Sequence, residues 1–258
     1  MVNATFSVAD GIGRVLIERE EALNSIDLET KEAIIETLSD YEDDEDVRAV
    51  LFETAGDRAF TAGGDLKEVV DLEYELEPFT ESWDRLFTRM VTLDTPTVAK
   101  VDGFTFGGGF DLILHTDIVV AAEEAQIGQP EVNLGIVNHF SPALLPGTVG
   151  LNKTLDLLLT GEPITGKRAA ELGLVARAVP ADDLDEEVES VLSVLKSHSP
   201  EILSRIKSVV YQGTEMSPSA ALTHAERVAH ETGDGPWMRE GVEAQLEKRD
   251  PEWAYDGE

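Results

Sequence analysis

The chain lacks cysteine, and it also lacks two features that mark large classes of proteins. None of its 258 residues is cysteine, so neither a disulfide framework nor a thiolate metal site can form. No apolar run approaches the roughly 18 residues needed to span a membrane. The first residues, MVNATFSVADGIGRV, contain no basic stretch followed by an apolar core, so no secretory signal is recognised. We therefore expect a soluble, cytoplasmic protein that does not contact a membrane.

Basic residues are scarce as well. The chain has 20 Lys and Arg against 52 Asp and Glu, which gives a net charge of −32. Binding nucleic acid requires clustered Lys and Arg on its phosphates, so the charge argues against a nucleic-acid partner. The hydrophobic content of 42% separates the chain from disordered acidic proteins. An acidic surface over an ordinary core predicts a protein from a halophile, because high charge maintains solubility in salt.

Apolar periodicity predicts strands that alternate with helices up to about residue 195. Asp10-Gly11 between the first two strands is a hairpin signal, and Asp27 is a suitable N-cap for the first helix. Residues 132–146 show no regular period, and we expect them to be irregular. Strands are predicted at 4–9, 13–17, 47–53, 97–101, 118–122 and 175–179, and helices at 28–41, 65–72, 79–93, 110–114, 151–160 and 182–196.

From residue 200 onward only helical patterns remain. The change in pattern predicts an α/β core over residues 1–195 and a C-terminal helical region over residues 196–258.

The central stretch, residues 103–131, combines glycines with two acids. Three consecutive glycines at 107–109 allow close backbone approach to a ligand. The N–H groups at the start of the helix that follows have no partner within the helix and suit a developing negative charge. Asp111 and Glu131 stand twenty residues apart. Backbone donors and two carboxylates are the groups needed to stabilise an oxyanion and move protons beside it.

Five segments carry a joint signal: EREEALNSID (18–27), AFTAGGDLKE (59–68), VDGFTFGGGFDLILHTDIVVAAEEAQIGQPEVNLG (101–135), LTGEPITGKRAAELGLVARAV (159–179) and EKRDPEW (247–253). Together they resemble the enoyl-CoA hydratase/isomerase family, the crotonase superfamily, over nearly the whole chain. The resemblance implies a spiral of repeated β-β-α turns with a CoA-thioester site in residues 1–195. It implies that the C-terminal helices, in residues 196–258, cover the active site and form a homotrimer or a dimer of trimers. CoA would be part of the substrate, with no separate cofactor and no metal.

The resemblance also assigns roles in binding the acyl-CoA thioester. The peptide N–H groups of Gly64 and Gly108 would hold the thioester oxygen. Arg19 and Lys67 are candidates for contacts with the CoA phosphates, with an ordinary surface charge as the alternative for each. The strip that would receive adenine and pantetheine comprises Ala62, Gly64, Asp65, Leu66 and Lys67.

The two acids carry over as the catalytic pair, with two departures from the family pattern. Glu131 would be the acid/base that transfers the proton, and Asp111 would orient the water. Hydratases usually have Glu at the first position, whereas some dienoyl-CoA isomerases share the Asp. The segment 136–142 replaces a Pro-Gly sequence and places His139 where some isomerases have a further acid. His139 is therefore a possible base, and a packing or surface role is the alternative.

The predicted function is hydration of a trans-2-enoyl-CoA to the 3-hydroxyacyl-CoA. An enoyl-CoA or dienoyl-CoA isomerase is the first alternative, because the same oxyanion site would serve it. Decarboxylation or hydrolysis of an acyl-CoA is a further alternative, and so is a CoA-thioester-binding paralogue without turnover. The presence of both acids argues against the last of these.

Overall fold

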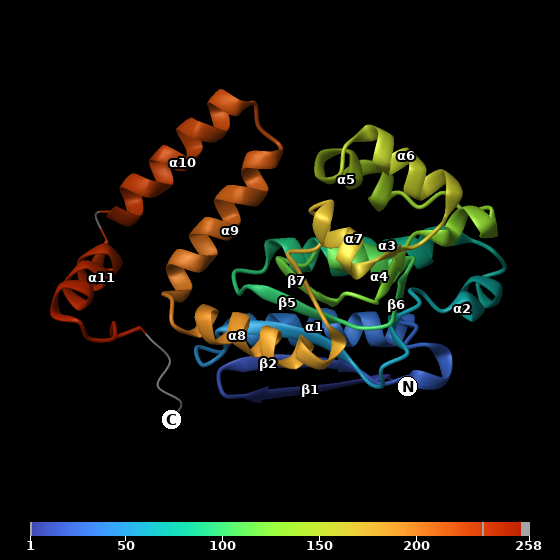
Figure 1. Cartoon of the computed structure of the whole chain (residues 1–258), viewed down its shortest axis with the longest axis horizontal. Coiled ribbons are helices and arrows are strands. Elements are labelled where there is room, and N and C mark those ends of the chain that lie inside the picture. Colours follow the sequence, from blue (N-terminus) through green and yellow to red (C-terminus); the bar gives the residue numbers. More distant parts are fainter. Residues whose placement is uncertain (1, 234, 254–258) are drawn as a thin grey trace.

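Two sheets, arranged in layers with helices, form the body of the protein in the computed structural model, which describes residues 2–233 and 235–253 (Figure 1). The strands are β1 (Ala4–Ala9), β2 (Ile12–Ile17), β3 (Ala49–Thr54), β4 (Ala59–Thr61), β5 (Thr97–Val101), β6 (Phe104–Phe106), β7 (Ile118–Ala122), β8 (Gln126–Gly128), β9 (Ile164–Thr165) and β10 (Arg177–Val179). One sheet has the order β1-β2-β3-β5-β7-β10, and the other has the order β4-β6-β8-β9.

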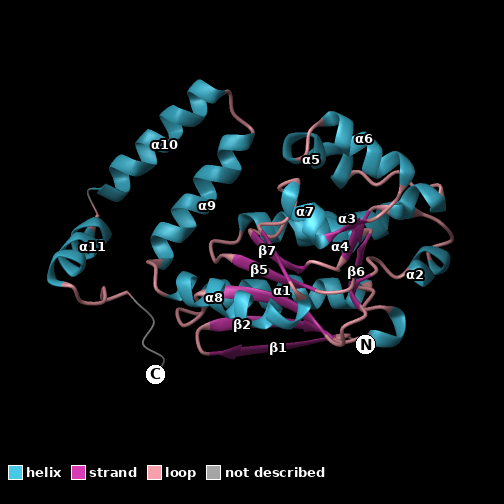
Figure 2. Cartoon of the chain, viewed as in Figure 1, coloured by secondary structure: helices cyan, strands magenta, loops and turns pink. Residues whose placement is uncertain are grey.

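Helices follow and flank these strands (Figure 2). They are α1 (Leu28–Asp43), α2 (Leu66–Asp71), α3 (Leu76–Thr92), α4 (Gly108–Leu114), α5 (Phe140–Thr148), α6 (Leu151–Thr160), α7 (Gly166–Glu171), α8 (Leu184–Lys196), α9 (Pro200–Thr214), α10 (Pro218–Gly233) and α11 (Pro236–Glu247). Short 3-10 helices occur at η1 (Glu20–Ala22), η2 (Pro130–Leu134) and η3 (Ala181–Asp183).

The chain winds as a spiral in which successive turns contribute one strand to each sheet. β3, β5 and β7 are parallel neighbours in the first sheet, while β4, β6 and β8 are parallel neighbours in the second. Helices α2 and α3 follow the first pair of strands, and α4 follows the second. The predicted β-β-α spiral is therefore present. β3, β5 and β7 are almost entirely buried, which explains their continuous apolar sequences.

Several sequence predictions are confirmed locally. β1 and β2 form the predicted antiparallel hairpin. The side chain of Asp27 accepts a hydrogen bond from the N–H of Thr30 at 2.9 Å and caps α1. On the same helix, Ile34, Leu38 and Tyr41 face the hydrophobic core.

The prediction of an irregular segment at residues 132–146 is wrong. This segment contains most of η2 and most of α5. Helix α5 has the sequence FSPALLPGT, and its prolines and glycine disguise a helix because they are poor helix formers. Pro142 lies in the first turn, where a missing N–H leaves no helical bond unmade.

Helix α3 begins three residues earlier than predicted. The strands of the second sheet were not predicted from the apolar pattern. Strands β4, β6 and β8 have only three residues each, and β9 has two. Such segments are too short to show the alternation of apolar and polar residues that identifies a strand in sequence. These short strands nevertheless determine where the central glycines lie.

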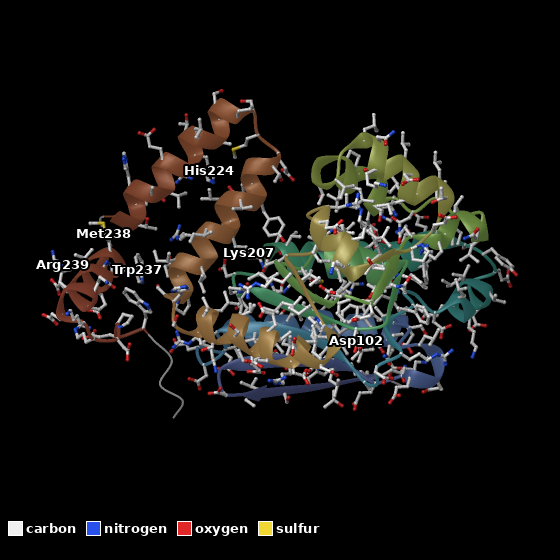
Figure 3. The ribbon with its side chains drawn as sticks, viewed as in Figure 1. Asp102, Lys207, His224, Trp237, Met238 and Arg239 are labelled. Atoms are coloured by element: carbon white, nitrogen blue, oxygen red, sulfur yellow. The ribbon has the colours of Figure 1, made fainter. Side chains whose placement is uncertain are left out.

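Helices α9, α10 and α11 lie to one side of the two sheets (Figure 1). Lys207 on α9 points toward the body of the molecule, whereas Trp237, Met238 and Arg239 lie at the start of the outer helix α11 (Figure 3). The Lys207 ammonium is 2.8 Å from an oxygen of Asp117, and it also donates to the carbonyl of Met90 at 3.0 Å. This buried ion pair attaches α9 to the core. Within the described ranges, no helix is long and apolar enough to cross a membrane.

Candidate active site

Two glycine-containing loops meet at the carboxyl ends of the neighbouring strands β4 and β6. Gly63 in the first loop has φ +92°, and a Cβ added there would lie 2.6 Å from the peptide nitrogen of Gly108. Only glycine combines that backbone conformation with so close an approach. The parallel pairing of β4 with β6 thus brings residues 62–65 and 106–109 together, although some forty residues separate them in sequence.

The peptide N–H groups of Gly64 and Gly108 remain free for a ligand. Ile26 donates to the carbonyl of Gly63 at 2.8 Å and accepts from the N–H of Asp65 at 3.4 Å. It therefore bonds to both neighbours of Gly64, and the Gly64 N–H has no partner among the described residues. Gly108 is the first residue of α4, where helical geometry supplies no acceptor for its N–H. Two such donors fit a developing oxyanion.

Asp111 lies on α4, one turn beyond these glycines, and is only 1% exposed. Three side chains donate to its carboxylate. The amide of Gln129 donates to Oδ2 at 3.2 Å, the amide of Asn138 donates to the same oxygen at 2.5 Å, and the hydroxyl of Ser141 donates to Oδ1. Burial raises the pKa of Asp111 to about 6, against the opposing effect of these hydrogen bonds. The sequence identified the acid but not the three donors.

Glu131 lies on η2, with its carboxylate against the backbone of Gly107. Its Oε2 is buried and has no hydrogen-bond partner within the described part of the chain. Burial raises the pKa of Glu131 to about 7, and the negative charge of Asp111 adds to this effect. The two acids therefore occupy different environments, one saturated with donors and the other with an unpartnered oxygen. Such a difference suits separate roles in proton transfer.

A cavity of about 150 Å³ is lined by Asp111, Glu131, Gly64 and Gly108. The rings of Phe79 and Trp83 pack directly on the glycines, because a Cβ at Gly64 or Gly108 would lie 2.3 Å or 2.6 Å from them. Of the predicted site residues, the lining includes Ala62, Gly64, Leu66, Gly108, Asp111, Glu131 and His139. None of the lining residues comes from α9, α10 or α11, so the predicted covering role of the C-terminal helices stays a prediction.

Arg19, Asp65 and Lys67 lie outside this lining. The guanidinium of Arg19 is 2.7 Å from Asp65 Oδ2, and its side chain is only 16% exposed. Asp65 Oδ1 accepts the N–H of Lys67 at 2.9 Å and caps α2. Arg19 is therefore not an ordinary surface charge, because it anchors the loop that carries Gly64. Lys67 is exposed and has no ion pair within the described residues. Contact of either cation with CoA phosphates stays a prediction.

His139 lies at the edge of the cavity. Its Nε2 is 3.0 Å from Asp84 on α3, and its ring packs on Phe140 with the ring centres 3.8 Å apart. The structure pairs this histidine with an exposed carboxylate rather than with Glu131. A role for His139 as a base stays a prediction.

Two buried cationic or basic side chains near the site gave no signal in the sequence. His115 Nδ1 is 2.7 Å from the carbonyl oxygen of Asp111, and its ring stacks on Phe87 with ring centres 4.3 Å apart. Lys31 is fully buried on α1, with its ammonium 4.7 Å from the ring centres of both Phe79 and Trp83. Burial lowers the pKa of Lys31 to about 8.

Among the described residues, no group of three or more His, Asp and Glu side chains is arranged to hold a metal ion. The chemistry available from the side chains and backbone of the cavity is oxyanion stabilisation and proton transfer.

Comparison with known proteins shows the family and the fold of the chain. The enoyl-CoA hydratase/isomerase family matches residues 7–256. A probable enoyl-CoA hydratase of Mycobacterium tuberculosis is 31% identical over 245 residues, covering 95% of this chain and 95% of its own. A probable enoyl-CoA hydratase of Bacillus subtilis is 30% identical over 256 residues, covering 98% of this chain and 99% of its own. The crystal structure of enoyl-CoA hydratase from Bacillus anthracis has a TM-score of 0.90 at 28% identity, covering 99% of this chain and 100% of the other. The chain belongs to the enoyl-CoA hydratase/isomerase family.

Proposed function

We propose that the protein hydrates a trans-2-enoyl-CoA to the 3-hydroxyacyl-CoA. The observation that carries this proposal is the placement of two carboxyl groups in one cavity with two free peptide N–H groups. Membership of the family implies an acyl-CoA substrate. The relatives named as enoyl-CoA hydratases support the choice of reaction.

The backbone would bind the thioester. Its carbonyl oxygen accepts hydrogen bonds from Gly64 and Gly108, which stabilise the negative charge that develops as the double bond is attacked. These donors belong to the backbone, so binding does not depend on the two acids.

The two carboxyl groups would then divide the proton transfers. Asp111, as a carboxylate, takes one proton from water while the water oxygen bonds to the β-carbon. The double bond opens, and protonated Glu131 gives its proton to the α-carbon. Transfer of the proton from Asp111 to Glu131 restores the starting state, so one water is added to each enoyl group.

The test follows the absorbance of the enoyl thioester with crotonyl-CoA in molar KCl. Loss of the band is expected, with formation of 3-hydroxybutyryl-CoA identified by mass. The Glu131→Gln variant serves as the inactive control. An unchanged band with active-site binding intact would contradict the proposal.

An enoyl-CoA isomerase is the second candidate, and one observation favours it. Asp111 already accepts three hydrogen bonds, which leaves few lone pairs for a water, whereas Glu131 Oε2 is unpartnered. A single carboxylate is enough to move a proton between two carbons. Conversion of a 3-enoyl-CoA to the conjugated 2-enoyl-CoA, with crotonyl-CoA unchanged, would select this reaction.

We also propose that the protein assembles as a homotrimer or a dimer of trimers. The C-terminal helices carry large apolar side chains that would be exposed to water in a monomer. The side chains with at least half of their surface exposed are Ile206, Val210, Leu222, Met238, Val242 and Leu246. Light scattering in high salt is expected to give the mass of three or six chains, and a stable monomer would refute the proposal.

A further inference from the structure

The side chain of Asn138 connects the start of α5 with the buried carboxylate of Asp111. Its Oδ1 accepts the N–H of Phe140 at 2.9 Å and the N–H of Ser141 at 3.1 Å. Because this end of the amide accepts from two N–H groups, it must be the oxygen, and the other end must be the nitrogen. That nitrogen lies 2.5 Å from Asp111 Oδ2. The fold of α5 therefore determines which end of Asn138 faces the acid.

The same helix presents a second donor to Asp111. Ser141, whose N–H is held by Asn138, donates its hydroxyl to Asp111 Oδ1. Gln129 completes the group by donating to Asp111 Oδ2 at 3.2 Å and to the Ser141 hydroxyl at 2.9 Å. Both carboxylate oxygens thus face donors, and two of the three donors depend on the start of α5.

Asn138 also acts on the second acid. It lies close enough to Glu131 to lower the pKa of that carboxyl, against the larger effect of burial. Asn138 lines the cavity together with both acids. Asn138 therefore lies in the same cavity as the two carboxyl groups that the reaction uses, and its amide donates to Asp111.

We propose that Asn138 is a positioning residue that directs Asp111 and keeps it ionised, so that Glu131 is the carboxyl that carries the proton. This inference rests on the proposed function. A carboxylate that accepts hydrogen bonds is favoured over its protonated form, and its charge then disfavours ionisation of a neighbouring acid. Loss of the amide donor would let the proton distribute over both acids.

The other titratable groups around Asp111 do not replace this donor. Glu131 faces it from η2 as a like charge. His139 acts to lower the pKa of Asp111 from a distance, but its ring nitrogen is paired with Asp84. His115 is bonded to the backbone carbonyl of Asp111 and not to its carboxylate.

The alternative is that Asn138 serves only to hold the start of α5. Asn138→Ser and Asn138→Asp separate the two roles, because both residues retain an oxygen that can cap a helix but lack the amide donor. Asn133→Ser is the matched control, since it makes the same change at an exposed position on η2. Melting of all three variants by circular dichroism is expected to resemble that of the parent chain.

With the fold retained, we expect Asn138→Ser to reduce kcat for crotonyl-CoA about 10- to 100-fold, because a small displacement of a catalytic group has an effect of this order. KM should change little, since the thioester is held by the peptide groups of Gly64 and Gly108. The acid limb of the pH profile should move upward by about one pH unit, and further in Asn138→Asp, which adds a negative charge. Asn133→Ser should change none of these quantities.

A double-mutant cycle identifies the residue through which Asn138 acts. Added to Asp111→Asn, the change Asn138→Ser should cause almost no further loss of kcat, because the group it positions has already been altered. Full activity of Asn138→Ser with an unshifted acid limb would overturn the inference. So would a loss that adds fully to that of Asp111→Asn.

An infrared titration tests the same inference without substrate, so that it remains decidable if the parent chain fails to hydrate crotonyl-CoA. Exposed carboxyl groups ionise at about pH 4, so C=O bands that titrate above pH 5 report the buried acids. Asp111→Asn and Glu131→Gln assign the two bands. Asn138→Ser should raise the transition of Asp111 by about one pH unit, and an unshifted transition would contradict the role given to Asn138. Failure of hydration alone would count against the proposed function only.

Discussion

The carboxylate of Glu131 lies directly on the backbone of Gly107: a Cβ at Gly107 would be 2.9 Å from Glu131 Oε1. Gly107 also has φ +58°, a conformation that side chains rarely adopt. The last loop residue before α4 is therefore glycine for two independent reasons. This contact places the second acid beside the helix that carries Gly108 and Asp111, so the two acids can act on one bound thioester.

The two acids are expected to behave as one unit in hydration. Asp111→Asn and Glu131→Gln should each reduce kcat about 10²- to 10⁴-fold, and the double variant should be little worse than either single one. Binding of the CoA thioester should persist, because the oxyanion donors are peptide groups. Rates on crotonyl-CoA and a 3-enoyl-CoA, with the exposed Glu124→Gln as control, measure this. If Asp111→Asn keeps near-full hydration, the paired-carboxylate mechanism is wrong.

The rate of the reaction should depend on pH through a bell-shaped profile that is the same in its two directions. Hydration needs Asp111 ionised and Glu131 protonated, so its rate should rise through about pH 6 and fall above about pH 7. Dehydration of the 3-hydroxyacyl-CoA needs Glu131 ionised and Asp111 protonated, which is again one proton on the pair, so its kcat/KM should follow the same profile. Rate profiles in both directions test this assignment. A rate that does not fall above about pH 7 would show that Glu131 does not carry the proton.

Glu131 should reduce stability at alkaline pH. Its folded-state pKa of about 7 lies above its ordinary value of 4.5, so its stabilising contribution is present below pH 4.5 and is lost as the pH rises through 7. Glu131→Gln cannot ionise and should be more stable than the parent by about 1–3 kcal/mol at pH 8. At pH 5 the two should be nearly equal. Chemical unfolding at pH 5 and pH 8 measures the free energy of unfolding of the parent and the variant. The same difference between the two proteins at both pH values would contradict the raised pKa.

Lys31 should have the opposite effect at higher pH, where it makes the free energy of unfolding increase with pH. Its folded-state pKa of about 8 lies below its ordinary value of 10.5, so between these values the unfolded chain binds more protons and folding becomes more favourable as the pH rises. The slope is at most about 1.4 kcal/mol per pH unit. Lys31→Met should flatten the increase between pH 8 and 10. Lys153→Met, which alters a partly exposed lysine on α6, should leave this increase unchanged.

Folding is expected to require salt. The net charge is −32, and the acidic side chains repel one another over a Debye length of about 10 Å at 0.1 M salt. The Debye length falls to about 3 Å at 1 M salt. Dilution from molar KCl to tens of millimolar should lower the melting temperature and separate the subunits. Circular dichroism and light scattering measure the two effects. An unchanged spectrum and melting temperature across this range would exclude the salt requirement and with it the predicted halophile origin.

The sequence by itself determined the parts of the fold that depend on local patterns. The apolar runs of β3, β5 and β7, the cap of α1 and the C-terminal helices are properties of neighbouring residues, and they were predicted at nearly the observed positions. The triple glycine and the spacing of Asp111 and Glu131 likewise pointed to groups that the structure brings together in one cavity.

Only the tertiary structure decided how those groups are held. The strands of the second sheet have two or three residues each, so their pairing, rather than any periodicity, brings Gly63 against Gly108. The donors to Asp111 come from positions 129, 138 and 141, up to 30 residues away. No local pattern announces such contacts, because a buried carboxylate is satisfied by whichever polar groups the folded chain places around it. The ionisation of the two acids is set by those contacts and by burial, and therefore by the fold.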